Sequence, residues 1–283
     1  MKLVRHGPPG HEKPGLLDSS QVIRDLSAII PDWTPTQLSP ETLARVAKLN
    51  PADLPAVPPN TRLGLPLLGI PKFIAIGLNY TDHAREVGRT HPAEPVIFTK
   101  AISCLTGPDD DVMLPKGSTR TDWEVELGVI IGKTARYVDK SNALNFVAGY
   151  CLVNDLSERE YQNDRGGTWD KGKGCDTFGP IGPWLVTADE LPDPQDLDLW
   201  LDVNGKRYQN GHTRNMIFPV AELIAWVSSY MTLFPGDLLT TGTPAGVGAG
   251  LKPPVFLKPG DTMQLGSARL GTQQHRVISW RQT

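Results

Sequence analysis

Two glutamates one residue apart, inside an apolar and β-branched segment, constrain this chain more than any other feature. Glu124 and Glu126 belong to the run Trp123–Leu127, which continues into the apolar stretch 128–132. Side chains two residues apart in a strand point to the same face, so the two carboxylates would stand side by side. Adjacent carboxylates on a half-buried strand repel each other and lose hydration unless a cation lies between them. The pattern therefore predicts a strand that binds a divalent metal ion; the alternative is an exposed strand face with two solvated acids.

The composition favours a turn-rich β-protein and excludes several classes of partner. The 283 residues include 28 glycines and 26 prolines, more than an average globular chain has. A net charge of -3 gives no reason to expect nucleic acid or an anionic membrane surface as a partner. The three cysteines are scattered without metal-binding spacing, which favours a reducing, cytoplasmic setting. We also find no apolar run near the roughly 20 residues of a membrane helix, and no signal-peptide core.

Prolines divide the chain into two regions. Six prolines between residues 51 and 71 exclude regular structure there. We therefore interpret residues 1–71 as a small N-terminal region with a Pro-rich connector, and residues 72–283 as the main domain. Before the connector we expect one short helix over residues 21–30 and a second beginning at Pro40.

The main domain is predicted to be mixed α/β and predominantly β. Short apolar runs between glycines and prolines are typical of strands, and the run 197–203 meets the hairpin signal Asn204-Gly205. One amphipathic helix is expected over residues 219–233. Besides the Glu-x-Glu segment, the predicted strands cover residues 73–77, 96–99, 146–153, 184–186, 197–203, 237–241 and 261–265.

Asp155 is the natural third ligand beside the two glutamates, because it follows directly on the strand predicted at 146–153. Three carboxylates leave coordination positions open for water and substrate, which suits Mg²⁺ or Mn²⁺ better than zinc. Taken alone, a carboxylate at a strand end is often only a helix cap. Asp122 shares the face of Glu124 and is a rival ligand, although its place at the strand start favours a capping or turn role.

Two further groups of residues are candidates for catalytic roles. His83 and Glu86 are three residues apart, so on a helical turn the carboxylate can orient the imidazole as a general base; the alternative is an ordinary surface pair. The glycine-rich stretch 165–180 carries Lys173, which could stabilise an enolate or a carboxylate, or lie in a flexible surface loop. Cys175 is a weaker candidate for a nucleophile, because no histidine lies nearby in sequence.

Six motifs, in this order, resemble the fumarylacetoacetate hydrolase superfamily. The resemblance spans about residues 72–270 and implies a mixed β-sandwich roll, usually dimeric, behind a small N-terminal region of variable structure. The motifs are Gly77-Leu78-Asn79-Tyr80 with His83 and Glu86, Phe98-Thr99-Lys100, Glu124-Val125-Glu126-Leu127, Asn154-Asp155-Leu156-Ser157-Glu158-Arg159, Gly172-Lys173-Gly174-Cys175-Asp176-Thr177-Phe178, and Thr241-Gly242-Thr243-Pro244-Ala245-Gly246-Val247-Gly248.

The resemblance implies a role for each site residue. It implies that Glu124, Glu126 and Asp155 bind Mg²⁺, or alternatively Mn²⁺. It also implies that His83 with Glu86 activates water and that Lys173 is the active-site lysine. The implied substrate contacts are Arg159, Gln162, Thr243, Tyr80 and, in a supporting position, Lys100.

The resemblance also implies a reaction. The run 165–184 is most similar to hydrolases of 2,4-diketo-3-deoxy-L-fuconate or L-rhamnonate. We therefore expect a cytoplasmic homodimer that cleaves the C3–C4 bond of a 2,4-dioxo acid, giving pyruvate and a second acid such as lactate. The alternatives are decarboxylation of oxaloacetate or a related oxo acid, isomerisation within the same superfamily, and a non-catalytic oxo-acid-binding module.

Overall fold

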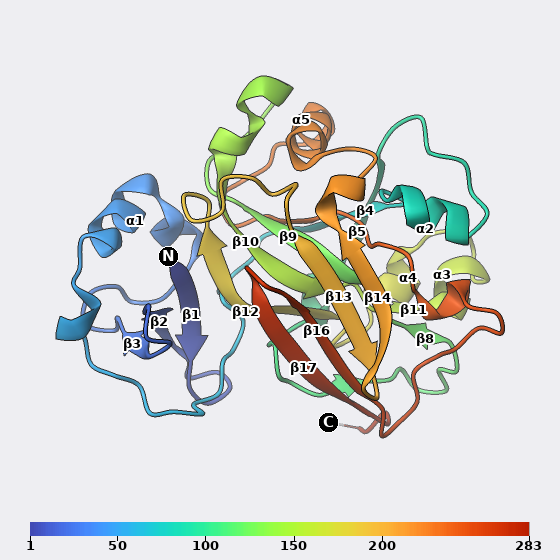
Figure 1. Ribbon diagram of the computed structural model, residues 1–283, viewed down its shortest axis with the longest axis horizontal. Coiled ribbons are helices and arrows are strands. Elements are labelled where there is room, and N and C mark those ends of the chain that lie inside the picture. Colours follow the sequence, from blue (N-terminus) through green and yellow to red (C-terminus); the bar gives the residue numbers. More distant parts are fainter. Residues whose placement is uncertain (283) are drawn as a thin grey trace.

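The computed structural model describes residues 1–282, and its main element is a large mixed sheet (Figure 1). Along this sheet the strands follow the order β3 (Ile23–Asp25), β2 (Lys13–Leu17), β1 (Lys2–His6), β12 (Gly179–Thr187), β10 (Val147–Asn154), β9 (Val125–Ile131), β15 (Leu238–Thr240), β4 (Phe73–Gly77) and β5 (Val96–Lys100), and β6 (Leu105–Thr106) pairs with β12.

A second sheet packs across β9 and β10 (Figure 1). Its order is β14 (Lys206–His212), β13 (Asp198–Val203), β16 (Thr262–Ser267), β17 (Gly271–Ile278) and β7 (Val112–Met113), and a small ladder joins β8 (Thr121–Asp122) to β11 (Ser157–Glu158). The fold is thus mixed α/β and strand-dominated, as the sequence predicts.

Helices are short and lie around the sheets. They are α1 (Pro40–Ala47), α2 (Thr81–Glu86), α3 (Arg159–Asn163), α4 (Asp170–Lys173) and α5 (Val220–Tyr230). Short 3₁₀ helices cover Pro35–Leu38, Pro51–Asp53, Ile102–Cys104, Lys140–Phe146, Thr213–Asn215 and Gly248–Gly250. Over the described residues, none of the helices has the length and apolar character needed to cross a bilayer. Three of the helices, α2, α3 and α4, gather at one side of the molecule (right in Figure 1), and they carry the predicted site residues His83, Glu86, Arg159, Gln162 and Lys173.

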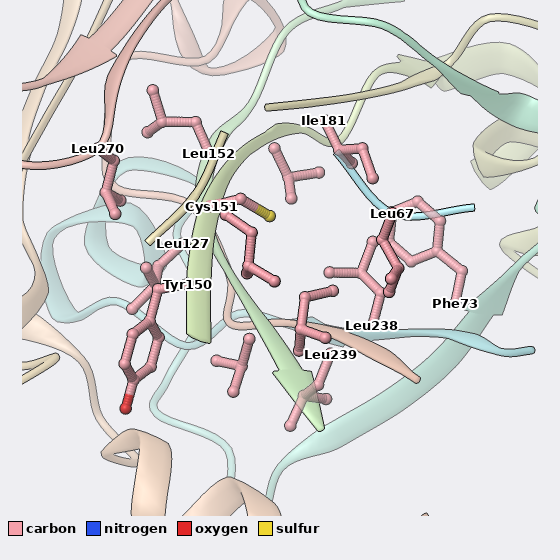
Figure 2. Packing of buried hydrophobic residues seen from close by; sticks show 14 of the residues in the cluster. Leu67, Phe73, Leu127, Tyr150, Cys151, Leu152, Ile181, Leu238, Leu239 and Leu270 are labelled. Atoms are coloured by element: carbon pink, nitrogen blue, oxygen red, sulfur yellow. The ribbon is translucent and has the colours of Figure 1, made fainter. Parts of the chain in front are cut away.

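The core surrounds the central strands β9 and β10 (Figure 2). All seven residues of β9 are buried, because sheet neighbours flank it on both edges and the second sheet packs across it. Leu127 and Leu152 are paired across the two strands and are fully buried. Burying apolar side chains on this scale is the dominant favourable term in folding. β9, which contains Glu126 and directly follows Glu124, is therefore held in place by the core.

The N-terminal region shares the large sheet with the main domain. β1 pairs antiparallel with β12, with Lys2 opposite Val186 and Leu3 opposite Leu185. Arg62, in the proline-rich stretch, forms ion pairs with Glu12 and with Asp110 of the main domain. The division at residue 71 therefore does not correspond to a break in the sheet.

The helix predicted over residues 21–30 is wrong, whereas α1 and α5 confirm the other two. Asp18 accepts hydrogen bonds from the backbone of Ser20 and Val22, and Gln21 has a φ of 62°. This side chain–backbone turn competes with a helix start and reverses the chain into β3, which pairs with β2. The sequence analysis also overlooked β1, β2 and β17.

Candidate metal centre and active site

Strand pairing brings the three predicted carboxylates together. β9 and β10 are antiparallel, with Val125 opposite Asn154 and Glu126 opposite Val153. One step further, the backbone N–H of Asp155 donates to the carbonyl of Glu124 at 2.9 Å, so these two residues are also opposite each other. Glu124, Asp155 and Glu126 therefore share one face, and each offers an oxygen within 4.8 Å of the others'. All three side chains are buried.

Two of the carboxylates are paired with cations of the chain itself. Lys173 Nζ lies 2.7 Å from Glu124 Oε2 and 2.7 Å from Asp155 Oδ2. Arg159 is 2.7 Å from Glu124 Oε1, and Lys100 Nζ is 2.6 Å from Asp155 Oδ1. Burial disfavours the charged form of Glu124, but the charges of Lys173 and Arg159 outweigh it and lower the pKa of Glu124 to about 2.

Glu126 has no such partner. Its side chain is 1% exposed, and no ion pair reaches it within residues 1–282. Its Oε2 accepts a hydrogen bond from the backbone N–H of Gly242 at 2.9 Å. Burial, together with the charges of Asp155 and Glu124, raises the pKa of Glu126 well above its usual range. The three carboxylates, of which Glu126 has no compensating cation, form an all-oxygen donor set that fits Mg²⁺ or Mn²⁺.

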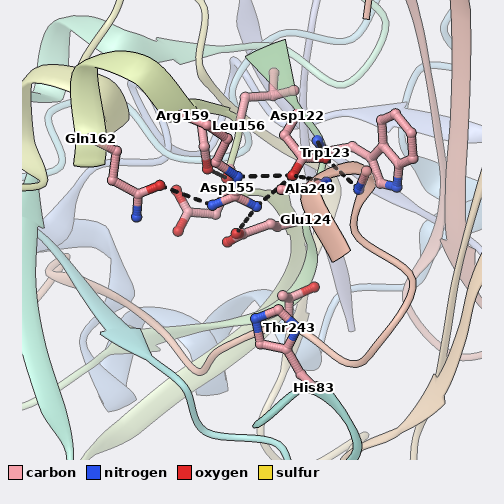
Figure 3. Close-up of polar contacts among 12 residues, drawn as sticks. His83, Asp122, Trp123, Glu124, Asp155, Leu156, Arg159, Gln162, Thr243 and Ala249 are labelled. Atoms are coloured by element: carbon pink, nitrogen blue, oxygen red, sulfur yellow. Dashed lines mark hydrogen bonds and ion pairs between the residues drawn. The ribbon is translucent and has the colours of Figure 1, made fainter. Parts of the chain in front are cut away.

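The predicted dyad forms on α2. His83 Nδ1 lies 3.1 Å from Glu86 Oε2, and Glu86 Oε1 accepts a hydrogen bond from Gly246 N at 2.9 Å. In Figure 3 the His83 imidazole and the carboxylates of Glu124 and Asp155 lie on opposite sides of the site. A ring that donates from Nδ1 to a carboxylate keeps Nε2 free to accept a proton.

One cavity of about 240 Å³ joins the dyad to the three carboxylates. Its wall is largely apolar, and the rings of Phe98 and Trp169 meet edge to face there with centroids 5.1 Å apart. Gly77 has to be a glycine because a Cβ at this position would lie 2.4 Å from the Trp169 ring. The cavity is lined by Ile76, Gly77, Leu78, His83, Val87, Arg89, Phe98, Glu124, Glu126, Asp155, Arg159, Gln162, Asn163, Trp169, Lys173, Thr243, Val247 and Ala249.

Most of the predicted site residues line this cavity, but three do not. Glu86 stands behind His83, as a residue that orients it must. Lys100 is buried behind Asp155 and also donates to the Leu156 carbonyl at 3.2 Å. Tyr80 is fully buried, and its hydroxyl has no hydrogen-bond partner. Lys100 thus lies in a supporting position behind a metal ligand, as expected, whereas Tyr80, predicted to contact the substrate, lies outside the lining of the cavity.

Thr243 lines the cavity, but its hydroxyl is already engaged. It donates to the Val125 carbonyl at 2.9 Å and accepts from Gln209 Nε2 at 2.7 Å. Arg159 and Gln162 are hydrogen-bonded to each other at 3.0 Å, and both face the cavity.

The rival candidates are placed elsewhere. Asp122 accepts from Gly248 N at 2.6 Å and Ala249 N at 3.0 Å and pairs with Arg159, so it holds a turn, as its position at the strand start favoured. Burial raises the pKa of the Cys175 thiol to about 11, and this thiol lies outside the cavity lining. Sequence reasoning missed Trp169, Arg89 and Val87; an aromatic residue beside the glycine pair 166–167 was the one available signal.

Comparison with known proteins agrees with this geometry. A curated protein of Burkholderia multivorans, named "Putative hydrolase", is 61% identical over 274 residues, which cover 96% of this chain and 97% of the relative. The maleylpyruvate hydrolase of Sphingobium sp. SYK-6, solved with manganese(II) ion and pyruvate, is 31% identical with a TM-score of 0.82, covering 99% of this chain and 100% of that one.

An isomerase is about equally similar. The 5-carboxymethyl-2-hydroxymuconate delta-isomerase of Mycobacterium smegmatis is 32% identical with a TM-score of 0.79, and the match covers 100% of both chains. Residues 72–278 match the family described as Fumarylacetoacetate (FAA) hydrolase C-terminal. This chain belongs to the fumarylacetoacetate hydrolase family, whose structural relatives include hydrolases and isomerases.

Proposed function

We propose that this protein is a metal-dependent hydrolase that cleaves the C3–C4 bond of a 2,4-dioxo acid to pyruvate and a second carboxylic acid. The observation that carries the proposal is the unpaired, buried Glu126 beside Glu124 and Asp155, in one cavity with His83. The manganese and pyruvate held by the Sphingobium relative support a divalent metal ion and the same product here.

Glu124, Glu126 and Asp155 would hold the ion. When bound, a divalent cation supplies Lewis acidity toward the carboxylate and 2-oxo oxygens of the substrate. Mg²⁺ is the ion we propose, with Mn²⁺ as the alternative, because the donor set is all oxygen.

His83 is proposed to activate the attacking water. Its Nδ1–H donates to Glu86, so Nε2 accepts a proton from water as the oxygen attacks C4. The C3–C4 bond then breaks, and its electron pair passes to C3, which gives the enolate of pyruvate and the second acid. The proton returns to C3, so that one water is consumed and pyruvate leaves.

The charged residues around the carboxylates are proposed to stabilise the enolate and hold the substrate. Lys173 is buried and fixed between Glu124 and Asp155, so its positive charge needs no reorganisation as negative charge develops. Arg159 and Gln162 face the same space and are proposed to contact the oxo-acid end. The apolar wall would pack against the remaining part of the substrate.

For the substrate we propose 2,4-diketo-3-deoxy-L-fuconate or L-rhamnonate, with lactate as the second acid. The basis is the similarity of the run 165–184 to hydrolases of these sugar acids. The C5–C6 part of such a substrate is small and ends in a methyl group, which suits a cavity of about 240 Å³ with an apolar wall. We further propose that the enzyme acts as a cytoplasmic homodimer.

A panel of 2,4-dioxo acids and oxaloacetate, with pyruvate quantified and with or without EDTA, tests the proposal. We expect pyruvate in equal amounts with the second acid, lost on chelation and restored by Mg²⁺ or Mn²⁺. If oxaloacetate is the one compound in the panel that yields pyruvate, the proposed hydrolysis is wrong and the reaction is a decarboxylation. Binding of Mn²⁺ and pyruvate without turnover of any compound would leave a non-catalytic binding module.

A further inference from the structure

The loop Gly246–Gly250 connects the strand segment of the metal ligands to the His83–Glu86 dyad. On one side, the indole Nε1–H of Trp123 donates to the Gly246 carbonyl at 3.0 Å. On the other side, the Gly246 N–H donates to Glu86 Oε1 at 2.9 Å, and the second oxygen of Glu86 meets His83. Trp123 directly precedes Glu124, so a single residue links the two halves of the proposed machinery.

The geometry of this loop is tightly determined. Gly246 has a φ of 109°, and a Cβ there would lie 2.0 Å from the Tyr208 carbonyl oxygen. A Cβ on Gly250 would lie 2.5 Å from the Glu86 carboxyl carbon. Gly246 therefore requires glycine, and a side chain at Gly250 would displace the Glu86 carboxylate, so the two glycines let the backbone approach this carboxylate closely.

Trp123 is itself fixed and does not line the cavity. It is fully buried, and its ring packs on Tyr208 with centroids 4.9 Å apart. Asp122 fastens the same loop through the N–H groups of Gly248 and Ala249 (Figure 3). The loop therefore has two attachments to the segment that precedes Glu124, and one of them leads straight to Glu86.

We propose that Trp123 is a positioning residue for the general base: through Gly246 it fixes the Glu86 carboxylate, which in turn selects the Nδ1–H form of His83. The expected effect on kcat rests on the proposed function, whereas the expected effect on the His83 tautomer does not. It attributes to Trp123 an effect on the turnover step and none on metal binding.

The first test measures His83 without any substrate. In ¹⁵N spectra of the full-length protein with Mg²⁺, neutral His83 should be the Nδ1–H tautomer in the wild type and a mixture of tautomers in Trp123→Phe. The matched control is Trp33→Phe, because Trp33 is also fully buried and its Nε1–H donates to the Gly15 carbonyl at 2.9 Å, away from the site. A His83 tautomer that is unchanged in Trp123→Phe, or changed equally in Trp33→Phe, overturns the proposal.

The second test is kinetic. We expect Trp123→Phe to lower kcat by about tenfold or more with KM and Mn²⁺ affinity unchanged, because residues that orient a catalytic group typically contribute factors of about 10–100. Because Trp123 acts through Glu86, Trp123→Phe combined with Glu86→Gln should lose no more activity than Glu86→Gln alone. Losses that multiply, or an equal loss of Mn²⁺ affinity, contradict the proposal.

A variant with the same shape covers the case in which Trp123→Phe does not fold. Benzothienylalanine at position 123 keeps the two-ring shape but replaces the N–H by sulfur, so it removes only the hydrogen bond to Gly246. The same tautomer mixture and kcat loss are expected, and wild-type behaviour overturns the proposal. If His83 responds as expected while no 2,4-dioxo acid is cleaved, the proposed reaction fails and the positioning role stands.

Discussion

Glu124, directly before β9, and Glu126, within β9, have their side chains on one face, yet their electrostatic surroundings are opposite. Glu124 is paired with Lys173 and Arg159, whereas Glu126 has no cationic partner in the described chain. Before any metal binds, the first carboxylate is thus compensated and the second is not. This contrast allows the metal site to be tested through stability alone.

Glu126→Gln should stabilise the metal-free protein, whereas Glu124→Gln should destabilise it. Because burial and the neighbouring carboxylates raise the pKa of Glu126, folding at pH 8 disfavours a carboxyl group that the unfolded chain ionises freely, and removing it should add about 1 kcal/mol or more. Removing Glu124 leaves two buried cations with fewer partners and should cost about 3 kcal/mol. Chemical denaturation in EDTA at pH 8 measures both changes. Shifts of the same sign in the two variants would contradict the assignment of Glu126 as the uncompensated ligand.

Metal binding should stabilise the wild type and not Glu126→Gln. A ligand that binds the folded state alone adds about 2.7 kcal/mol when its concentration is about 100 times its Kd. Thermal unfolding with and without Mn²⁺ is the measurement, and the control is the same titration on Glu126→Gln. An equal upward shift of Tm in the variant would place the ion elsewhere.

His83→Gln should lose C–C hydrolysis while it retains ligand binding. General-base catalysis contributes about 10²–10⁴-fold to rate, so kcat should fall within that range, and pyruvate should still bind to the Mn²⁺-loaded protein. His91→Gln is the matched control, because His91 is exposed on the same segment and lies outside the cavity lining. Unchanged hydrolysis in His83→Gln would remove the histidine from the mechanism and favour a reaction that needs no water.

His275, far from the carboxylates in sequence, should make stability fall in mild acid. Burial lowers the pKa of His275 from 6.5 to about 4, so the folded state stays neutral where the unfolded chain already binds a proton. Stability should therefore be lost as the pH falls from about 6.5 to about 4, by about 3 kcal/mol in total. Chemical denaturation at several pH values measures this, and the free energy of unfolding should depend less on pH in His275→Gln than in the wild type.

The opposite result would also be informative. The two ring nitrogens of His275 face oxygen acceptors, the Asp110 carbonyl at 2.8 Å and Gln273 Oε1 at 3.0 Å. Only a charged ring donates to both. If the stability of the wild type relative to His275→Gln instead rises as the pH falls toward about 6.5, these hydrogen bonds outweigh burial and the imidazole is charged in the folded protein.

The metal ligands could be predicted from sequence because strand periodicity is local. A spacing of two residues places Glu124 and Glu126 on one face whatever the rest of the fold, and a carboxylate at a strand end is visible as well. The cations that pair with them are a different matter. Arg159 meets Asp122 and Glu124 across more than 30 positions in sequence, and no periodicity records such a contact.

Two differences between the predicted and the observed fold, at β17 and at residues 21–30, share a physical cause. β17 buries Gln273 and His275, whose amide and ring are satisfied by distant backbone groups, so the strand lacks the apolar alternation used to recognise one. In the N-terminal region, the turn made by the Asp18 side chain replaced the helix that the apolar spacing predicted. In both cases a polar side chain decided the local structure.

The pairing of β1 with β12 limits how this protein can be shortened. A fragment that starts at residue 72, where the family match begins, would lack β1, β2 and β3 and would leave the backbone of Lys2's partner strand around Leu185 and Val186 unpaired. Exposed edge strands recruit other chains. We expect such a fragment to aggregate during expression, because in the intact chain β1 covers this edge of β12.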